Sequence, residues 1–416
     1  MTGRAEAIVL RDVHSPPMRA FHLGWVSFFA CFFAWFSIAP LMVVVRDELG
    51  LTQQQVGDTI IASVAGTILA RLAVGKLCDR YGPRRVYAAL MGLGALPVAG
   101  LGLVNSYESL LILRLLVGGV GASFVVTQYH TTLMFSPTVV GTANATTAGW
   151  GNLGGGVTQV VMPLVMAGVL ALGVEPGSAW RLSMLFPATL LLVLSVVYWR
   201  FTRDSPDGSW TPRGVDQGGG LLALLRDHRV VFLFLVYGAC FGVELTIHNV
   251  AALYFVDNFE ISIGAAGLAA ACFGGMNLFA RSLGGIASDR VGRTRGVRGR
   301  LLVLCVLLLT QGAALLAFAE MRSLWPAIAS LIVFSVFVQM AEGATFAVVP
   351  FVNRDALGGV VGLVAAGGNT GAVAAGFLFR NNDLPWSDAL SILGLAAILA
   401  ALPVLGMYAR YKEQPA

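Results

Sequence analysis

The sequence predicts an all-α membrane protein in which twelve transmembrane helices form two six-helix bundles. Hydrophobic residues make up 57% of the 416 residues and charged residues only 12%, whereas a water-soluble protein carries about 25% charged residues. Twelve stretches are long and apolar enough to cross a bilayer, and a repeated pattern relates the two halves of the chain. These three observations exclude a soluble or a disordered protein.

Each predicted span contains about 20 or more mostly apolar residues, enough to cross about 30 Å of hydrocarbon. The spans cover approximately residues 21–45, 56–78, 86–105, 109–133, 140–170, 180–200, 229–254, 262–288, 300–319, 324–349, 357–380 and 386–409. An even number places both termini on one side, which carries 20 Lys and Arg residues against four on the other. The positive-inside rule therefore predicts cytoplasmic termini in the cell (inner or plasma) membrane. The first span is followed by no small-residue cleavage site, so we expect no removable signal peptide.

A polar stretch at about 201–228 divides the spans six and six. It contains Pro206, Asp207, Gly208 and Pro212, a composition typical of a linker. The expected organisation is a cytoplasmic N-terminal segment (1–20), an N-terminal bundle (21–200), a cytoplasmic linker (201–228), a C-terminal bundle (229–410) and a cytoplasmic tail (411–416).

Two sequence patterns occur once in each bundle, which indicates an internal repeat. A shift of 210 residues superimposes Arg71, Gly75, Asp79, Arg80 and Gly82 on Arg281, Gly285, Asp289, Arg290 and Gly292. A shift of 217 residues superimposes Gly141, Gly151, Asn152 and Gly154 on Gly358, Gly368, Asn369 and Gly371. Two parallel halves with a site between them near mid-membrane are typical of secondary transporters, and the sequence has no P-loop for ATP.

The remaining sequence features argue against other classes of protein. The five cysteines lie in or beside apolar segments without CxxC or Cys/His spacing, so we expect neither a metal site nor disulfides. The basic residues form short clusters between spans, which favours membrane orientation over nucleic-acid binding. The sequence shows no nucleophile–base constellation and no ring of pore-lining charges. We therefore expect a monomeric transporter without a cofactor, rather than an enzyme or a channel.

Arg71 and Arg281 are the most informative residues. Each lies eight residues before the aspartate of its repeat, about 12 Å along a helix, and thus near the bilayer midplane. A charged residue there costs at least about 2.5 kcal/mol and usually faces a cavity or a partner. One interpretation is a structural ion pair with Glu244, Glu342 or a helix end. The other, which we favour, is a clamp in which two arginines that no acid neutralises bind one planar anion between them.

The glycine-rich run Ala148–Gly156 and its repeat Ala365–Gly371 form the second signal. Small residues allow close helix packing, which accounts for part of the pattern. Packing alone does not explain the amide in each run, Asn152 and Asn369, because a buried amide must find hydrogen-bond partners. Both amides can donate to an anion.

These motifs resemble known families. Residues 75–85, GKLCDRYGPRR, resemble the loop motif between the second and third spans of the major facilitator superfamily, and the resemblance extends from Phe21 to about Arg410. The two glycine-rich runs resemble the signature motifs of its nitrate/nitrite porter family. That resemblance implies that Arg71 and Arg281 bind nitrate, with Asn152 and Asn369 as signature asparagines. It also implies that Phe124, Tyr237 and Phe241 complete the pocket, although aromatic residues in a span more often serve packing.

The candidates for proton coupling are Glu244, His248, Glu342 and His130. Two of them, Glu244 and His248, share one helix face with Tyr237 and Phe241. The stretches around Glu244 and Glu342 resemble the assimilatory uptake branch of plants, fungi and cyanobacteria. Glu244, His248, Glu342 and, behind them, His130 can carry protons because burial and nearby arginines tune their pKa values. The alternative for each is a polar residue satisfied in a helix interface.

Arg114, in another superfamily motif, is interpreted as structural or as part of proton handling. The loop residues Gly75, Asp79, Arg80, Gly82, Asp289 and Arg290 are interpreted as a gating motif.

The predicted function is import of nitrate, and of nitrite, by alternating access and proton symport. Exchange of nitrate for nitrite is the alternative within the class. Proton-driven export of drugs or organic cations is disfavoured, because two midplane arginines repel a cation. The expected partners are nitrate, nitrite, protons and membrane lipids. The basic run Arg290–Arg300 is interpreted as a solvated loop, with lipid headgroups as an alternative contact.

Overall fold

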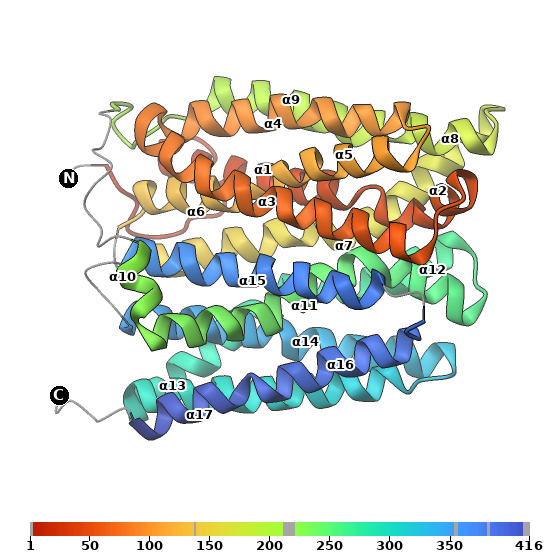
Figure 1. Ribbon diagram of the computed structural model, residues 1–416. Helices are drawn as coiled ribbons and strands as arrows, with labels where there is room; N and C mark the ends of the chain where they lie inside the picture. Colours follow the sequence, from red (N-terminus) through yellow and green to blue (C-terminus); the bar gives the residue numbers. More distant parts are fainter. Residues whose placement is uncertain (1–2, 137–138, 211–220, 353–356, 381–382, 411–416) are drawn as a thin grey trace. The chain divides into compact units, whose positions relative to one another are not determined.

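The computed structural model describes residues 3–136, 139–210, 221–352, 357–380 and 383–410 (Figure 1). Within these residues the regular structure is helical, and the one β-type interaction is an isolated parallel bridge between Ala5 and Phe135. The same residues contain twelve helical segments that are long and apolar enough to cross a membrane. The all-α class with twelve candidate spans is therefore confirmed.

The chain forms two compact units. The first unit comprises Met1–Val215, Ala251–Val256 and Ile261–Gly275, and the second comprises Asp216–Val250, Asp257–Glu260 and Met276–Ala416. Each unit is described by itself below.

The first unit contains ten α-helices within its described residues, linked in three places by short 3-10 turns. The helices are α1 (Pro16–Phe36), α2 (Met42–Leu49), α3 (Gln53–Tyr81), α4 (Pro83–Gly100), α5 (Tyr107–Val117), α6 (Ser123–Met134), α7 (Val140–Ala171), α8 (Pro176–Ser183), α9 (Leu185–Phe201) and α12 (Ile263–Gly275). The turns are η1 (Ala39–Leu41), η2 (Leu101–Leu103) and η3 (Gly118–Ala122). Helix α1 packs against α7, α3 against α5 and η3, and α4 against α9.

Local sequence explains where α3 begins and ends. At its start, the Thr52 hydroxyl accepts a hydrogen bond from the Gln55 amide at 3.2 Å, while the Thr52 amide donates to Gln55 Oε1 at 2.9 Å. This capping box satisfies two amides that have no partner inside the helix. At its end, Gly82 has φ +85°, a conformation that a side chain would strain. Pro83 then starts α4, because its fixed φ suits the first helical turn.

The second unit contains the other described helices. They are α10 (Leu221–Arg226), most of α11 (His228–Phe259), α13 (Ala280–Ala319), α14 (Leu324–Val348), α15 (Leu357–Arg380), α16 (Trp386–Leu399) and α17 (Ala401–Arg410), with the turns η4 (Met276–Leu278) and η5 (Val349–Phe351). Helix α13 packs against α14, α16 and α17. It is two helices joined at Gly296, where φ is +56°, so that one continuous element contributes to two candidate spans.

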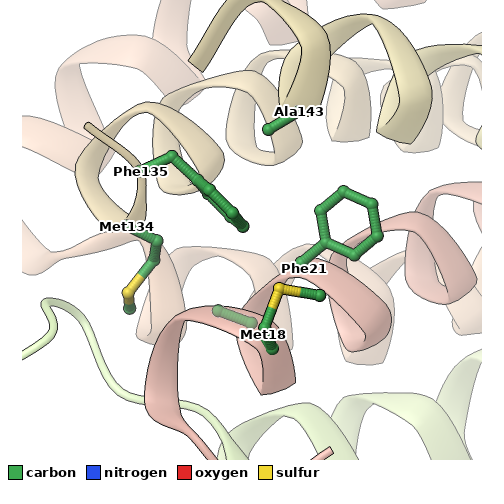
Figure 2. Packing of buried hydrophobic residues seen from close by; sticks show 6 residues of the cluster. Met18, Phe21, Met134, Phe135 and Ala143 are labelled. Carbon is green, nitrogen blue, oxygen red and sulfur yellow. The ribbon is translucent and has the colours of Figure 1, made fainter. Parts of the chain in front are cut away.

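The N-terminal segment, residues 3–15, docks on the connection between α6 and α7. The Ala5 amide donates to the Met134 carbonyl at 3.0 Å, and the Ser136 amide donates to the Ala5 carbonyl at 2.9 Å. Beside this bridge, Met18 and Phe21 of α1 pack against Phe135 in a buried apolar cluster, which Figure 2 shows. The cluster ties the chain's start to the ends of two helices that carry predicted site residues.

Candidate functional site

In the first unit, Arg71 lies on α3 against aromatic rings and backbone. Its side chain is buried, its Nη2 donates to the Gly121 carbonyl of η3 at 3.4 Å, and its Cζ lies 5.4 Å from the centre of the Phe124 ring. The Phe124 ring packs at 5.7 Å on Phe28 of α1. A guanidinium on the face of a ring is attracted by the ring quadrupole, so the aromatic pair holds this cation in an apolar setting.

In the second unit, Arg281 of α13 lies against two aromatic side chains of α11. Its Nη2 donates to the Tyr237 hydroxyl at 3.1 Å, and its Cζ lies 5.5 Å from the centre of the Phe241 ring. Tyr237 and Phe241 are one helical turn apart and stack at 5.1 Å with an angle of 15° between their planes. Phe346 of α14 packs edge-on to Tyr237 at 4.9 Å. The structure therefore brings the predicted arginine and aromatic residues of this half together.

Two buried carboxyl groups also reach Arg281. Glu342 of α14 forms a hydrogen-bonded ion pair with Arg281 through its Oε2, and Glu244 Oε2 of α11 lies 4.0 Å from the same Nη2 atom. Both glutamate side chains are completely buried. The expectation that no acid neutralises the two arginines is therefore wrong for Arg281. The ion pair offsets a cost of burial, because removing one unpaired ion from water costs several kcal/mol, on the order of its desolvation penalty.

Glu244 has two further partners. The Asn277 amide of η4 donates to Glu244 Oε1 at 2.6 Å, and His248 Nε2 lies 3.5 Å from the same oxygen. The contact with His248 follows from their spacing of four residues on α11. Asn277 was not predicted, because it lies 33 residues away and only the fold brings it to Glu244. Its one sequence signal is a polar amide inside an apolar stretch.

The glycines of the two signature helices allow close contact with the aromatic walls. A Cβ on Gly151 of α7 would collide with Phe28, and one on Gly368 of α15 would lie 3.0 Å from Tyr237 Cδ1 and closer still to Phe241. Phe28, which the sequence analysis did not single out, thus occupies in the first unit the place that Tyr237 and Phe241 share in the second. The glycines allow the signature helices to approach these aromatic side chains closely.

Asn152 and Asn369 follow these glycines directly and are completely buried. Within the described residues, neither the amide nitrogen nor the oxygen of either side chain has a hydrogen-bond partner. An unsatisfied buried polar group costs about 1–3 kcal/mol, and native proteins seldom leave one without a reason. The same orphaned amide in both repeats indicates a ligand or water that these groups contact.

His130 and Arg114 have partners within the first unit. His130 Nδ1 lies 2.6 Å from the Tyr198 hydroxyl, and its Nε2 lies 2.7 Å from the Arg203 carbonyl. Because a carbonyl only accepts, Nε2 carries the proton and Nδ1 of the neutral ring accepts from Tyr198. Arg114 is buried and its Nη1 donates to the Trp35 carbonyl at 3.2 Å. His130 and Arg114 therefore contact groups of the first unit, whereas Glu244 belongs to the second unit.

The loop motif makes different contacts in the two units. In the first, the Arg84 amide donates to Asp204 Oδ1 at 2.9 Å, and a Cβ on Gly82 would collide with the same carboxyl. Burial raises the pKa of Asp204. In the second, Asp289 pairs with Arg300, and no contact with Arg290 is recorded among the described residues. Arg80 stacks on its neighbour Tyr81 at 5.2 Å, and the Asp79 side chain lies outside the described residues.

Comparison with known proteins identifies the family. Residues 24–376 match the model of the Major Facilitator Superfamily. High affinity nitrate transporter 2.5 of Arabidopsis thaliana is 39% identical over 414 residues, which cover 98% of this chain and 82% of that protein. Nitrate/nitrite transporter NrtP of Picosynechococcus sp. is 28% identical over 449 residues, which cover 85% of this chain and 83% of that protein. The chain belongs to the nitrate/nitrite porters of the major facilitator superfamily.

The solved structures that it resembles share the fold. A bacterial homologue of the human lysosomal transporter Spinster, in an inward-facing and occupied conformation, has a TM-score of 0.70 at 15% identity and covers 95% of this chain and 96% of that one. A mutant of the nucleoside transporter NupG also has a TM-score of 0.70, at 13% identity, and covers 93% of this chain and 99% of that one. The family match and the twelve apolar helices make the porter a multi-pass membrane protein.

Proposed function

We propose that this porter imports nitrate, and nitrite as well, into the cytoplasm across the inner or plasma membrane by alternating access. The observation that carries the proposal is the repeated arrangement of a buried arginine, an aromatic wall and a signature asparagine in each unit. The substrate is proposed from relatives that are named as nitrate and nitrate/nitrite transporters.

The chemistry of these groups suits a small planar oxyanion. A guanidinium is always charged and presents paired donors in one plane, which matches two oxygens of nitrate or nitrite. Arg71 and Arg281 supply one such cation from each unit. Asn152 and Asn369 supply amide donors that lack partners within the described residues. Phe124, Tyr237 and Phe241 close the sides, and their apolar rings strengthen the charge interactions by excluding water.

Proton symport is the favoured coupling mode. Glu244, Glu342 and His248 are titratable groups beside Arg281 or one contact away from it, whereas anion exchange needs no titratable group. His130 remains a weaker candidate, because both ring nitrogens bond to other groups. The loop residues Gly75, Asp79, Arg80, Gly82, Asp289 and Arg290 are proposed to gate the cytoplasmic side. We further propose that the porter acts as a monomer with both termini in the cytoplasm.

Flux measurements in liposomes test this function. Purified porter is reconstituted, and nitrate entry is followed with and without an inward proton gradient, and with and without nitrite inside. We expect gradient-driven uptake into vesicles that contain no nitrite. Uptake only when nitrite is trapped inside would replace symport by nitrate/nitrite exchange. The absence of nitrate and nitrite flux under all these conditions would overturn the proposed substrate.

A further inference from the structure

We propose that the Glu342 carboxylate competes with the transported anion for Arg281, and that a proton on Glu342 releases Arg281 for the anion. The inference rests on the proposed function and assigns the coupling of anion and proton to one ion pair. It follows from the partners of Arg281, from the charge of the buried cluster and from the different surroundings of the two glutamates.

The Nη2 edge of Arg281 is already occupied by protein oxygens. Glu342 Oε2 and the Tyr237 hydroxyl accept hydrogen bonds from Nη2, and Glu244 Oε2 lies 4.0 Å from it. An incoming anion gains little from a guanidinium whose charge a carboxylate has neutralised. Protonation of Glu342 removes that negative charge and returns the net charge of Arg281 to the anion.

The charge of the whole cluster supports a ratio of one proton to one anion. The titratable and charged groups that face Glu342 come from two neighbouring helices: Arg281 of α13, and Tyr237, Cys240 and Glu244 of α11. His248 of α11 lies one contact further away, beside Glu244. With both glutamates ionised and His248, Tyr237 and Cys240 neutral, this cluster carries a net charge of −1. A nitrate ion changes it to −2, and one accompanying proton restores −1. Because unpaired buried charge is costly, the anion and the proton are expected to enter together.

The surroundings of the two glutamates select Glu342 as the proton acceptor. Asn277 donates to Glu244 at 2.6 Å and His248 lies beside it, so Glu244 keeps partners that favour its charged form. Glu342 has its ion pair with Arg281, and its Oε1 has no hydrogen-bond partner among the described residues. A proton on Glu342 weakens its ion pair with Arg281 and can be donated to the neighbouring Glu244 carboxylate, whereas a proton on Glu244 disturbs contacts with Asn277 and His248.

The proton balance of one cycle is closed. A proton from the outer solution binds the Glu342 carboxylate, Arg281 keeps its own proton throughout, and the anion takes the place of the carboxylate. After the porter opens inward, the anion leaves and the proton passes to the cytoplasm. Glu342 then pairs again with Arg281. In this scheme Asn277 is a positioning residue, since it holds Glu244 ionised through its amide.

The decisive test is the pH dependence of nitrate affinity of the detergent-solubilised porter. In the wild type we expect the nitrate Kd to rise about tenfold per pH unit above the titration of Glu342, as the linkage of one proton to one anion requires. Glu342→Gln removes the titrating group and should give a Kd that no longer changes with pH, together with loss of gradient-driven accumulation in liposomes. Glu320→Gln, an exposed glutamate at the end of α13, is the matched control and should keep the wild-type slope.

Each other outcome has a distinct meaning. A slope that disappears in Glu244→Gln and persists in Glu342→Gln would overturn the assignment to Glu342. A wild-type Kd that is independent of pH would overturn the competition itself while leaving nitrate binding intact. The absence of nitrate and nitrite binding by the wild type would instead overturn the proposed function.

A measurement on the wild type alone keeps the proposal testable if Glu342→Gln does not fold. Nitrate is added to the porter in weakly buffered solution that contains a pH-indicator dye. We expect uptake of about one proton for each nitrate bound in the alkaline range. Binding of nitrate without proton uptake would overturn the proposal.

Discussion

The two units use the same scaffold around their arginines but give them different partners. In the first, Arg71 contacts the Phe124 ring and the Gly121 carbonyl among its partners, and in the second Arg281 contacts a carboxylate and a phenol. In the first unit Gly154 lies against Phe29, and in the second Gly371 lies against Gly238. Phe29 and Gly238 are therefore equivalent positions 209 residues apart, and the same offset aligns Glu244 with Trp35. The repeat offset of 217 residues aligns Glu342 with Val125. The aromatic and amide groups are thus duplicated, whereas the first unit has Trp35 and Val125 at the positions aligned with the two acids.

The largest effect is expected from replacing either arginine by lysine. Arg71→Lys and Arg281→Lys keep the charge but lose the planar paired donors, and loss of a charge-assisted hydrogen bond costs about 1.5–3 kcal/mol. We expect nitrate uptake in liposomes to fall about 10- to 100-fold for both variants. Size-exclusion chromatography should show folded protein in each case. Wild-type uptake by either variant would show that its unit does not contribute a cation to the site.

Alanine in place of the signature glycines should destabilise both units alike. A Cβ on Gly154 or Gly371 would collide with a backbone carbonyl of the facing helix, which cannot rotate away as a side chain can. Overpacking of this kind costs about 1–3 kcal/mol, so we expect the Tm of each variant to fall by several degrees. Gly168→Ala on α7 and Gly362→Ala on α15 have open space at the new Cβ and serve as controls. A fall in the controls equal to that in the variants would contradict the packing role.

The signature asparagines should affect transport without lowering stability. Asn152→Leu and Asn369→Leu remove amides whose atoms have no partner within the described residues. We expect about tenfold slower nitrate uptake, the equivalent of one lost hydrogen bond of about 1.4 kcal/mol, with a Tm equal to or above that of the wild type. A Tm lowered by several degrees would instead indicate that the amides stabilise the fold. An effect confined to one variant would show that the two units contact the anion unequally.

The smallest effects are expected at the loop motifs. Because burial raises the pKa of Asp204, its folded form favours the protonated carboxyl, and the stability that it contributes at low pH is lost as pH rises through the folded pKa. Asp204→Asn should therefore equal the wild type in Tm near the acid end and exceed it slightly at neutral pH. A Tm difference that grows toward acid would contradict this sign.

The equivalent loop of the second unit should respond to salt rather than to pH. Asp289 is 59% exposed and pairs with Arg300, and such surface pairs contribute about 0–1 kcal/mol. Asp289→Asn should change the Tm by less than Gly371→Ala does, and the change should shrink as ionic strength rises. A change that persists in high salt would show that the pair is screened from solvent.

The sequence predicts the spans well and the breaks inside them less well. Hydropathy requires only a count of apolar residues, so twelve segments could be placed. It does not show that η3 interrupts the fourth span at Gly118–Ala122, where a Cβ on Gly118 would collide with the Ser63 carbonyl of α3. At the site, spacings of four and three residues on α11 predict that Tyr237, Phe241 and Glu244 share one face. Two other contacts join different elements, which helical spacing does not predict. The pairing of Glu342 with Arg281 was one of two interpretations of the sequence, and the contact of Asn277 with Glu244 was not predicted.

The docked N-terminal segment has a practical consequence for anyone who labels this porter. Ala5 is hydrogen-bonded to the connection of α6 and α7, and these helices carry Phe124 and Asn152. A fluorescent protein or affinity tag fused directly before residue 3 would disturb the hydrogen bonds between Ala5 and that connection. The same attachment turns into an advantage for spectroscopy. A small environment-sensitive dye on the N-terminal segment would report any change in the surroundings of these two helix ends when nitrate is added.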